Sequence, residues 1–273
     1  KVVANGPLQL RVRSEYKIGA SSSMIQDMVF HSNSAQVDFE TSLDWAEKHK
    51  LFKSEFAFDI LSDFARHEIQ YGYAERPTHT NLINDRARFE VCMHKWSDIS
   101  ENGFGISLLN DCKYGVGVEG STFRITLIKS GTHPDPRGDA GNHYFTYSLL
   151  PHACGFSTEA VIRPAYELNI PVLSYNVSDG AQGFSGLISV EKPNVIVETI
   201  KAAENDDGLI IRLYEAEKTG THTKISFNKP VQYVEETNLL EESVMPIDIN
   251  DNAIELYIKP FEIKTIRCKL TEI

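Results

Sequence analysis

The chain has 273 residues, of which 41% are hydrophobic and 24% are charged, and its formal net charge is −11 at pH 7. A chain of this size can bury roughly 75% of the surface that its unfolded form exposes, so it is long enough to build a sizeable core. The acidic balance argues against a nucleic-acid or anionic-membrane partner, because both attract basic surfaces. No apolar run approaches a membrane span, and the first residues contain no signal-peptide core.

Cysteine and histidine give no pattern of a metal or redox site. The four cysteines are scattered without a Cys-x-x-Cys pair, and the nine histidines form no His-x-x-x-His pair. We therefore expect no metal in this chain, four reduced and mostly buried thiols, and an intracellular, cytoplasmic protein. The cysteines are Cys92, Cys112, Cys154 and Cys268.

Alternation of apolar and polar residues predicts β-strands along most of the chain. It is clear over residues 8–12, 37–41, 104–108 and 123–127. Turn-forming clusters separate these runs, which favours an all-β fold: a large antiparallel β-sandwich with little helix.

Three further patterns concern the second half of the chain. Residues 157–166 predict the one short helix, with Ser157 or Thr158 as its cap and Pro164 limiting its length. Residues 174–186 are rich in glycine, serine and asparagine, so we expect a single unit over 1–273 with at most a soft division near 170–186. Between 254 and 270 the apolar phase slips twice, which indicates bulges or a strand that changes sheets.

Two loops combine polar residues with turn formers at the ends of predicted strands. The first, residues 110–113, follows the strand at 104–108, and the second, residues 133–143, contains two prolines that stiffen it and glycines that permit close approach. Rigid polar loops at strand ends are suited to recognising a ligand. The candidate side chains are Asn110, Asp111, Lys113, Asp139 and His143.

Blocks of residues spread over nearly the whole chain resemble, in order, one known family. These blocks are Glu75–His79, Arg88–Val91, His94–Asp98, Asn102–Gly115, Asp135–Tyr147, Gly208–Glu215 and Pro260–Arg267. Together they are similar to the C-terminal β-domain of glycoside hydrolase family 38, the α-mannosidases, and within that family to the cytosolic, vacuolar and bacterial enzymes.

The resemblance implies a supersandwich like that of galactose mutarotase, and a parent that is a retaining α-mannosidase. In that family an N-terminal α/β barrel carries the catalytic nucleophile and the zinc ion, which holds the sugar's vicinal hydroxyls while a carboxylate attacks. That barrel would lie upstream of Lys1, so this chain is expected to be a C-terminal fragment with no catalytic residue and no cofactor of its own. Its partners would be the missing barrel and, through the parent, an α-mannoside.

The family's β-domain resembles a lid wall that adds polar contacts to the sugar site, which gives the two loops a substrate-binding role. The resemblance adds Arg76 and His79 to that role. Relatives commonly continue with threonine, serine, tryptophan and aspartate, where this chain has Leu82–Asp85. Trp45 and Trp96 are expected in the core or an interface rather than stacked on a sugar.

Two other functions stay open beside the α-mannosidase β-domain: an independent carbohydrate-binding module, and a mutarotase-like enzyme that uses histidine and glutamate as acid and base. No mutarotase motif and no exposed aromatic strip is visible, so the first function is preferred. If the first strands of the domain are missing, the strand at 8–12 or the C-terminal strands should have an unpaired edge, and two copies could associate there as a homo-oligomer.

Overall fold

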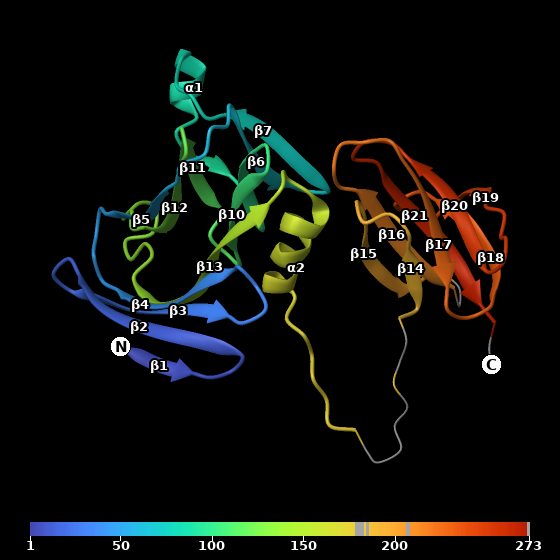
Figure 1. The fold of residues 1–273 in the computed structure, drawn as a ribbon, viewed down its shortest axis with the longest axis horizontal. Helices are drawn as coiled ribbons and strands as arrows, with labels where there is room; N and C mark the ends of the chain where they lie inside the picture. Colours follow the sequence, from blue (N-terminus) through green and yellow to red (C-terminus); the bar gives the residue numbers. More distant parts are fainter. Residues whose placement is uncertain (178–182, 184–185, 206–207, 272–273) are drawn as a thin grey trace. The chain divides into compact units, whose positions relative to one another are not determined.

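The computed structural model describes residues 1–177, 183, 186–205 and 208–271, and the chain divides into two compact units, Lys1–Val172 and Leu173–Ile273 (Figure 1). The described strands of each unit pair with strands of the same unit. Residues 171–177 carry no secondary structure, so no strand pairing links the two units there. The structure thus has two β-units where the sequence predicted one, and the boundary falls within the range 170–186.

Unit 1 consists of two antiparallel sheets around one core. The larger sheet has nine strands in the order β1-β2-β3-β4-β13-β10-β9-β6-β7, and the smaller has four in the order β5-β12-β11-β8. The strands are β1 (Val2–Asn5), β2 (Gln9–Ile18), β3 (Ser22–His31), β4 (Val37–Trp45), β5 (Leu51–Ala57), β6 (Phe64–Ile69), β7 (Gly72–Pro77), β8 (Val91–Cys92), β9 (Trp96–Glu101), β10 (Phe104–Asn110), β11 (Gly115–Glu119), β12 (Thr122–Lys129) and β13 (Gly141–Ala153). The predicted all-β class with antiparallel sheets is confirmed.

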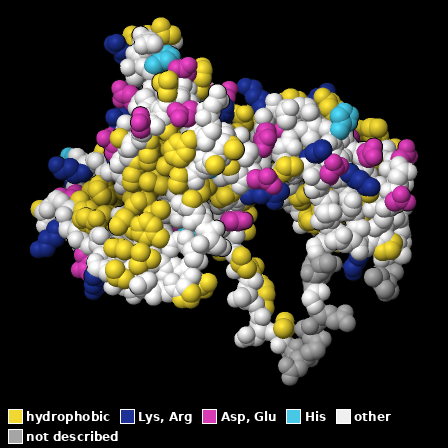
Figure 2. Space-filling model, viewed as in Figure 1, with side chains coloured by type: hydrophobic (Ala, Val, Ile, Leu, Met, Phe, Trp, Pro, Cys, Tyr) yellow, Lys and Arg dark blue, Asp and Glu magenta, His cyan; other side chains and the backbone are white. Residues whose placement is uncertain are grey.

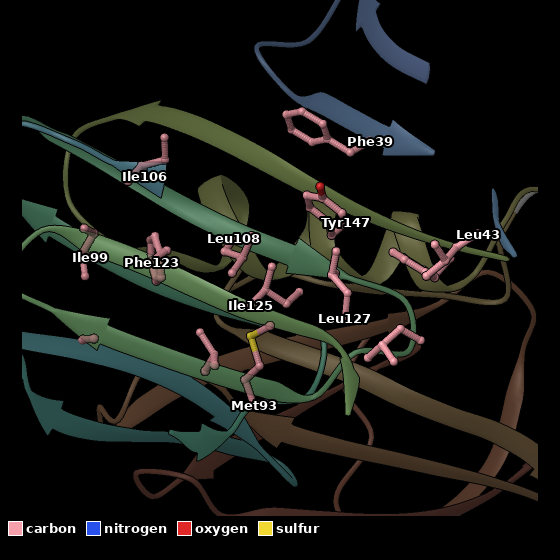
Figure 3. Close-up of a cluster of buried hydrophobic side chains, with 14 of the residues drawn as sticks. Phe39, Leu43, Met93, Ile99, Ile106, Leu108, Phe123, Ile125, Leu127 and Tyr147 are labelled. Carbon is pink, nitrogen blue, oxygen red and sulfur yellow. The ribbon is translucent and has the colours of Figure 1, made fainter. Parts of the chain in front are cut away.

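The core of unit 1 lies between these sheets, as the alternation predicted. Leu108 of β10 and Phe123 and Ile125 of β12 are fully buried, and their side chains lie in one cluster (Figure 3). In Figure 2 hydrophobic side chains also gather on the viewed face of unit 1, near the place of β5 and β12 in Figure 1. Trp45 and Trp96 are buried, at 2% and 1% exposure, which agrees with a packing role.

Helices are few and short in the described residues: α1 (Ile83–Ala87), a π-helical turn η1 (Thr158–Ile162) and α2 (Arg163–Asn169). The Ser157 side chain accepts a hydrogen bond from the backbone N–H of Ala160, so the predicted cap is correct. Pro164 does not end the helix. It lies in the first turn of α2, directly after η1, and the helix continues to Asn169.

Unit 2 also has two antiparallel sheets, in the orders β14-β17-β20 and β15-β16-β21-β18-β19. The phase slip between 258 and 263 marks the turn between β20 and β21, which belong to different sheets. The strands are β14 (Ile188–Val190), β15 (Val195–Ala202), β16 (Leu209–Glu215), β17 (Thr221–Phe227), β18 (Val231–Thr237), β19 (Ser243–Pro246), β20 (Ala253–Ile258) and β21 (Ile263–Leu270).

Two expectations about exposure are wrong. The strand at 8–12 has no unpaired edge, because β2 pairs with β1 on one side and β3 on the other, and the last strand, β21, lies between β16 and β18. The thiols are not mostly buried either, since Cys268 is buried but Cys92, Cys112 and Cys154 are exposed and free. No helix among the described residues is long and apolar enough to cross a membrane.

Candidate functional site

The first polar loop is held by the side chain of Asn110, which is fully buried at the end of β10. Its Nδ2 donates to the carbonyl oxygen of His94 at 2.6 Å, and its Oδ1 accepts the backbone N–H of Lys113 at 2.6 Å. Asn169 of α2 donates to the backbone carbonyl of Asn110 at 2.9 Å. Asn110 therefore shapes the loop from inside, and both ends of its amide are already used.

The same loop is tied to the middle of β13. Asp111 donates its backbone N–H to the carbonyl of Thr146 at 3.1 Å, and its Oδ2 accepts the backbone N–H of Thr146 at 2.8 Å. Lys113 places its Nζ 4.6 Å from the centre of the Phe145 ring, in a cation–π contact. No carboxylate of the described residues lies within 4.0 Å of this ammonium group, so its charge has no ion-pair partner.

The second loop closes on itself at the same strand. His143 donates from Nε2 to the backbone carbonyl of Asp139 at 2.7 Å, and Asp139 Oδ2 accepts the backbone N–H of Lys129 at 3.1 Å. His143 stands two residues before Phe145 on β13, and Asn110 pairs with Tyr147. Both predicted loops thus lie toward the same end of β13, with His143 about 13 Å along the strand from Tyr147.

Cys112, between Asp111 and Lys113, is not a nucleophile. Although the residue as a whole is exposed, burial of its thiol, reinforced by the neighbouring Asp111 carboxylate, raises its pKa to about 12. The thiol stays protonated at neutral pH, and a protonated thiol neither attacks nor binds a metal well.

Arg76 and His79 lie apart from the two loops. Arg76 is on β7, the last strand of the nine-stranded sheet, and the strands β9 and β6 separate β7 from β10. At about 4.8 Å between neighbouring strands, the two sites are roughly 14 Å apart across the sheet. The seven predicted residues therefore fall into two places rather than one.

Arg76 and His79 line a pocket of about 70 Å³, which we call the arginine pocket. Its wall combines β6 and β7 with β11, β12 and the segment around α1. Thr78 fixes this region, because its hydroxyl donates to the Ser62 carbonyl at 2.6 Å and its own carbonyl accepts the Gly120 N–H at 2.7 Å. The polar residues around the pocket include His67, Arg76, His79, Asp85, Arg86, Arg88, Glu119 and Arg124.

His67 lines the arginine pocket and is buried, at 2% exposure. Its Nδ1 lies 2.8 Å from the Ser97 hydroxyl. Burial, with a smaller contribution from the positive charge of Arg76, lowers the pKa of His67 from 6.5 to about 4. His67 is therefore neutral at physiological pH.

Sequence reasoning missed His67, Arg86, Arg88 and Arg124 as lining residues of one pocket. Arg86 and Arg88 stand close together in the sequence, but no sequence spacing links them to His67 or Arg124, which reach the pocket from β6 and β12. Only strand pairing brings these four together. Among the described residues no group of three His, Cys, Asp or Glu side chains is arranged as metal ligands.

Comparison with known families covers both units. Residues 1–137 match the model of the glycosyl hydrolases family 38 C-terminal domain, and residues 194–266 match the model of the family 38 C-terminal β-sandwich domain. The chain belongs to glycoside hydrolase family 38. The first match includes the arginine pocket and the loop at 110–113, and it ends two residues before Asp139.

The family 38 relatives of this chain are much longer proteins. It is 39% identical to human alpha-mannosidase 2C1 over 256 residues, covering 92% of this chain and 25% of the human protein. It is also 39% identical over 283 residues to alpha-mannosidase G of Dictyostelium discoideum, covering 98% of this chain and 26% of that protein. The chain thus spans about a quarter of the length of these curated relatives.

A solved family member has the same fold. An alpha-mannosidase from Enterococcus faecalis superposes with a TM-score of 0.83 at 16% identity, covering 98% of this chain and 34% of that enzyme. The prediction of a C-terminal β-domain of family 38 is confirmed.

Proposed function

We propose that this chain is the non-catalytic C-terminal β-domain of a zinc-dependent, retaining α-mannosidase that hydrolyses terminal α-mannosides. Three quarters of the length of the curated relatives lies outside the match, which leaves room for a catalytic domain. That domain would supply the zinc ion and the nucleophile. The contribution of this chain would be to support it and to lend polar groups to the sugar site.

The observation that supports the substrate-facing role is that both polar loops lie toward the same end of β13. Within this cluster Lys113 keeps a positive charge without an ion-pair partner among the described residues, and His143 uses its Nε2 to hold the loop. We propose that Lys113 and His143 meet the sugar, while Asn110, Asp111 and Asp139 position them. That Arg76 and His79 contact the same substrate stays a prediction, because two strands separate β7 from β10.

The proposal has a direct test in the longer polypeptide that it requires. Lys113→Ala and His143→Ala should each lower turnover of an aryl α-mannoside roughly ten- to hundredfold, because a polar contact made to the transition state contributes about 1–3 kcal/mol. Lys48→Ala, an exposed lysine outside both loops, is the matched control. Unchanged turnover in both loop variants, with the control also unchanged, would assign the loops to structure alone.

The isolated 273-residue chain should not hydrolyse aryl α-mannosides, with or without added zinc. Turnover that a chelator abolishes would contradict the proposal and favour an enzyme complete in itself. No observation on the described residues favours a free-standing carbohydrate-binding module or a mutarotase-like enzyme. A cytoplasmic location and association into a homo-oligomer stay predictions.

A further inference from the structure

The arginine pocket carries more positive than negative charge, although the chain as a whole is acidic. Four guanidinium groups line it, against two carboxylates. Figure 2 shows basic, acidic and histidine side chains crowded around α1, at the top of unit 1 in this view. The four cations are Arg76, Arg86, Arg88 and Arg124, and the two anions are Asp85 and Glu119.

Both carboxylates are already engaged. Glu119 accepts a hydrogen bond from Arg124 at 2.9 Å, and Arg124 also pairs with Glu55 at 2.5 Å. Asp85 Oδ2 accepts the backbone N–H of Leu82 at 3.0 Å, and Arg88 lies 4.0 Å from Oδ1. Neither carboxylate therefore forms an ion pair with Arg76 or Arg86.

Arg76 and Arg86 have no carboxylate within 4.0 Å in the part of the chain that the structure describes. Arg86 donates from Nε to the Thr80 carbonyl at 3.2 Å, so its other guanidinium donors are left for a ligand. The Nε of Arg76 is buried and has no hydrogen-bond acceptor among the described residues. A buried donor without an acceptor is costly. Because this Nε is buried, a ligand in the pocket would contact Arg76 through its terminal guanidinium nitrogens.

His67 lies close enough to Arg76 to respond to its charge. Burial, and to a smaller extent the positive charge of Arg76, lowers the pKa of His67. An anion bound beside Arg76 would reduce the second of these contributions. His67 is therefore a built-in reporter of what binds next to Arg76.

The size of the pocket fits a small group. About 10–15 Å³ on the same measure holds one water molecule, so 70 Å³ admits a group of several heavy atoms. Planar guanidinium groups with several donors bind phosphate oxygens in pairs, which makes arginine the preferred residue for such a group. We propose that the arginine pocket binds a phosphate group, with Arg76 and Arg86 as its cationic contacts.

The inference does not depend on the α-mannosidase role, because binding can be measured on the 273-residue chain without any catalysis. Inorganic phosphate is the probe, with sodium chloride at matched ionic strength as the reference, and the imidazole NMR signals are the readout. The His67 signals should shift and saturate with phosphate but not with chloride. His222 of unit 2, whose ring lies 4.7 Å from that of Tyr257, should not shift.

Variants identify the contacts. Arg76→Gln and Arg86→Gln should each weaken phosphate binding about tenfold or more, because each removes charge-assisted hydrogen bonds. Arg163→Gln is the matched control, since Arg163 is an exposed arginine on α2 outside the pocket. If Arg76→Gln does not fold, the phosphate affinity of Arg86→Gln tests the proposal, because Arg86 is more exposed than Arg76.

Three outcomes measured on the 273-residue chain would overturn the proposal: no saturable effect of phosphate beyond that of chloride, equal weakening by Arg163→Gln, or a saturable shift that survives both pocket substitutions. A further arm tests the source of the ligand. If a sugar phosphate competes more strongly than inorganic phosphate, the natural ligand is a phosphate ester. If the longer polypeptide binds neither while the 273-residue chain binds, an acidic side chain of the parent fills the pocket, and the phosphate proposal falls.

Discussion

The two polar regions of unit 1 differ in what their side chains are free to do. In the loops beside β10 and β13, Asn110, Asp111 and Asp139 each accept a backbone N–H, although Oδ1 of Asp111 is buried without a hydrogen-bond partner among the described residues. In the arginine pocket, Arg76 and Arg86 face space without a carboxylate partner among the described residues. In the loops the asparagine and aspartate side chains hold the backbone, and Lys113 is the cation left without an ion-pair partner among the described residues. In the arginine pocket the cations themselves form the wall.

The contrast has a simple physical origin. Short polar side chains reach nearby backbone groups, so they are readily satisfied within a loop. A guanidinium group has five donors in a fixed fork and is rarely satisfied by one neighbour. Unit 2 offers a third case in Glu215, a fully buried carboxylate whose oxygens accept from Asn194, Glu217, Thr219 and Phe261. A buried carboxylate whose two oxygens both accept hydrogen bonds in this way has a structural role.

The largest expected effect tests whether Asn110 holds the loop at 110–113 in place. Asn110→Ala should destabilise the 273-residue chain by about 3–4 kcal/mol, because it leaves the His94 carbonyl and the Lys113 N–H without their partner. Urea unfolding of wild type and variant measures the difference. Lys113→Ala, which removes an ammonium group but keeps both hydrogen bonds of Asn110, is the control. An Asn110→Ala variant as stable as the wild type would show that the loop is not held from inside.

The second effect concerns His67 and acid. Its folded-state pKa of about 4 lies below the ordinary value of 6.5, so between these values the unfolded chain binds the extra proton. Stability should therefore fall as the pH falls from 6.5 to 4, by roughly 3 kcal/mol from this group. His67→Gln can still bond Ser97 but does not titrate, so the unfolding free energies of the two proteins should converge as the pH falls. Parallel pH profiles would contradict the assignment.

Sequence reasoning predicted the class of fold and the family, but only part of the site. Alternation located the core strands because a strand with one buried face leaves a local pattern, as at 123–127. The glycine- and serine-rich stretch indicated a possible soft division near 170–186, where the boundary between the units lies, but not two units with separate sheets, because strand pairing is a property of the assembled sheets. The arginine pocket was missed for the same reason: His67 and Arg124 meet there only because β6 and β12 belong to facing sheets.

A smaller effect separates the shape of the arginine pocket from its charge. A Cβ at Gly117 of β11 would lie 2.6 Å from the carbonyl oxygen of Phe89, so Gly117→Ala must push the segment around Phe89 away from the sheet. The chain should lose roughly 2 kcal/mol of stability, and its phosphate affinity should fall although no charge changes. Gly6→Ala is the control, because a Cβ at Gly6 would meet no atom within 4 Å. Gly120→Ala is unsuitable as a control, because a φ of +58° strains any residue with a side chain. An unchanged affinity would mean that the Phe89 segment does not shape the binding site.

The smallest expected effect separates two roles of Asp139 in the second loop: holding the loop and contacting the substrate. Asp139 accepts one backbone hydrogen bond, from Lys129, at a half-buried position, so Asp139→Ala should cost the isolated chain only about 1 kcal/mol. Thermal unfolding of the 273-residue chain measures the loss of stability, and turnover of the longer polypeptide measures the loss of activity. If Asp139 only positions His143, Asp139→Asn should restore both quantities, because an amide oxygen also accepts the Lys129 N–H. If the asparagine variant regains stability but not turnover, the negative charge itself reaches the substrate, and Asp139 joins Lys113 and His143 as a residue that meets the sugar.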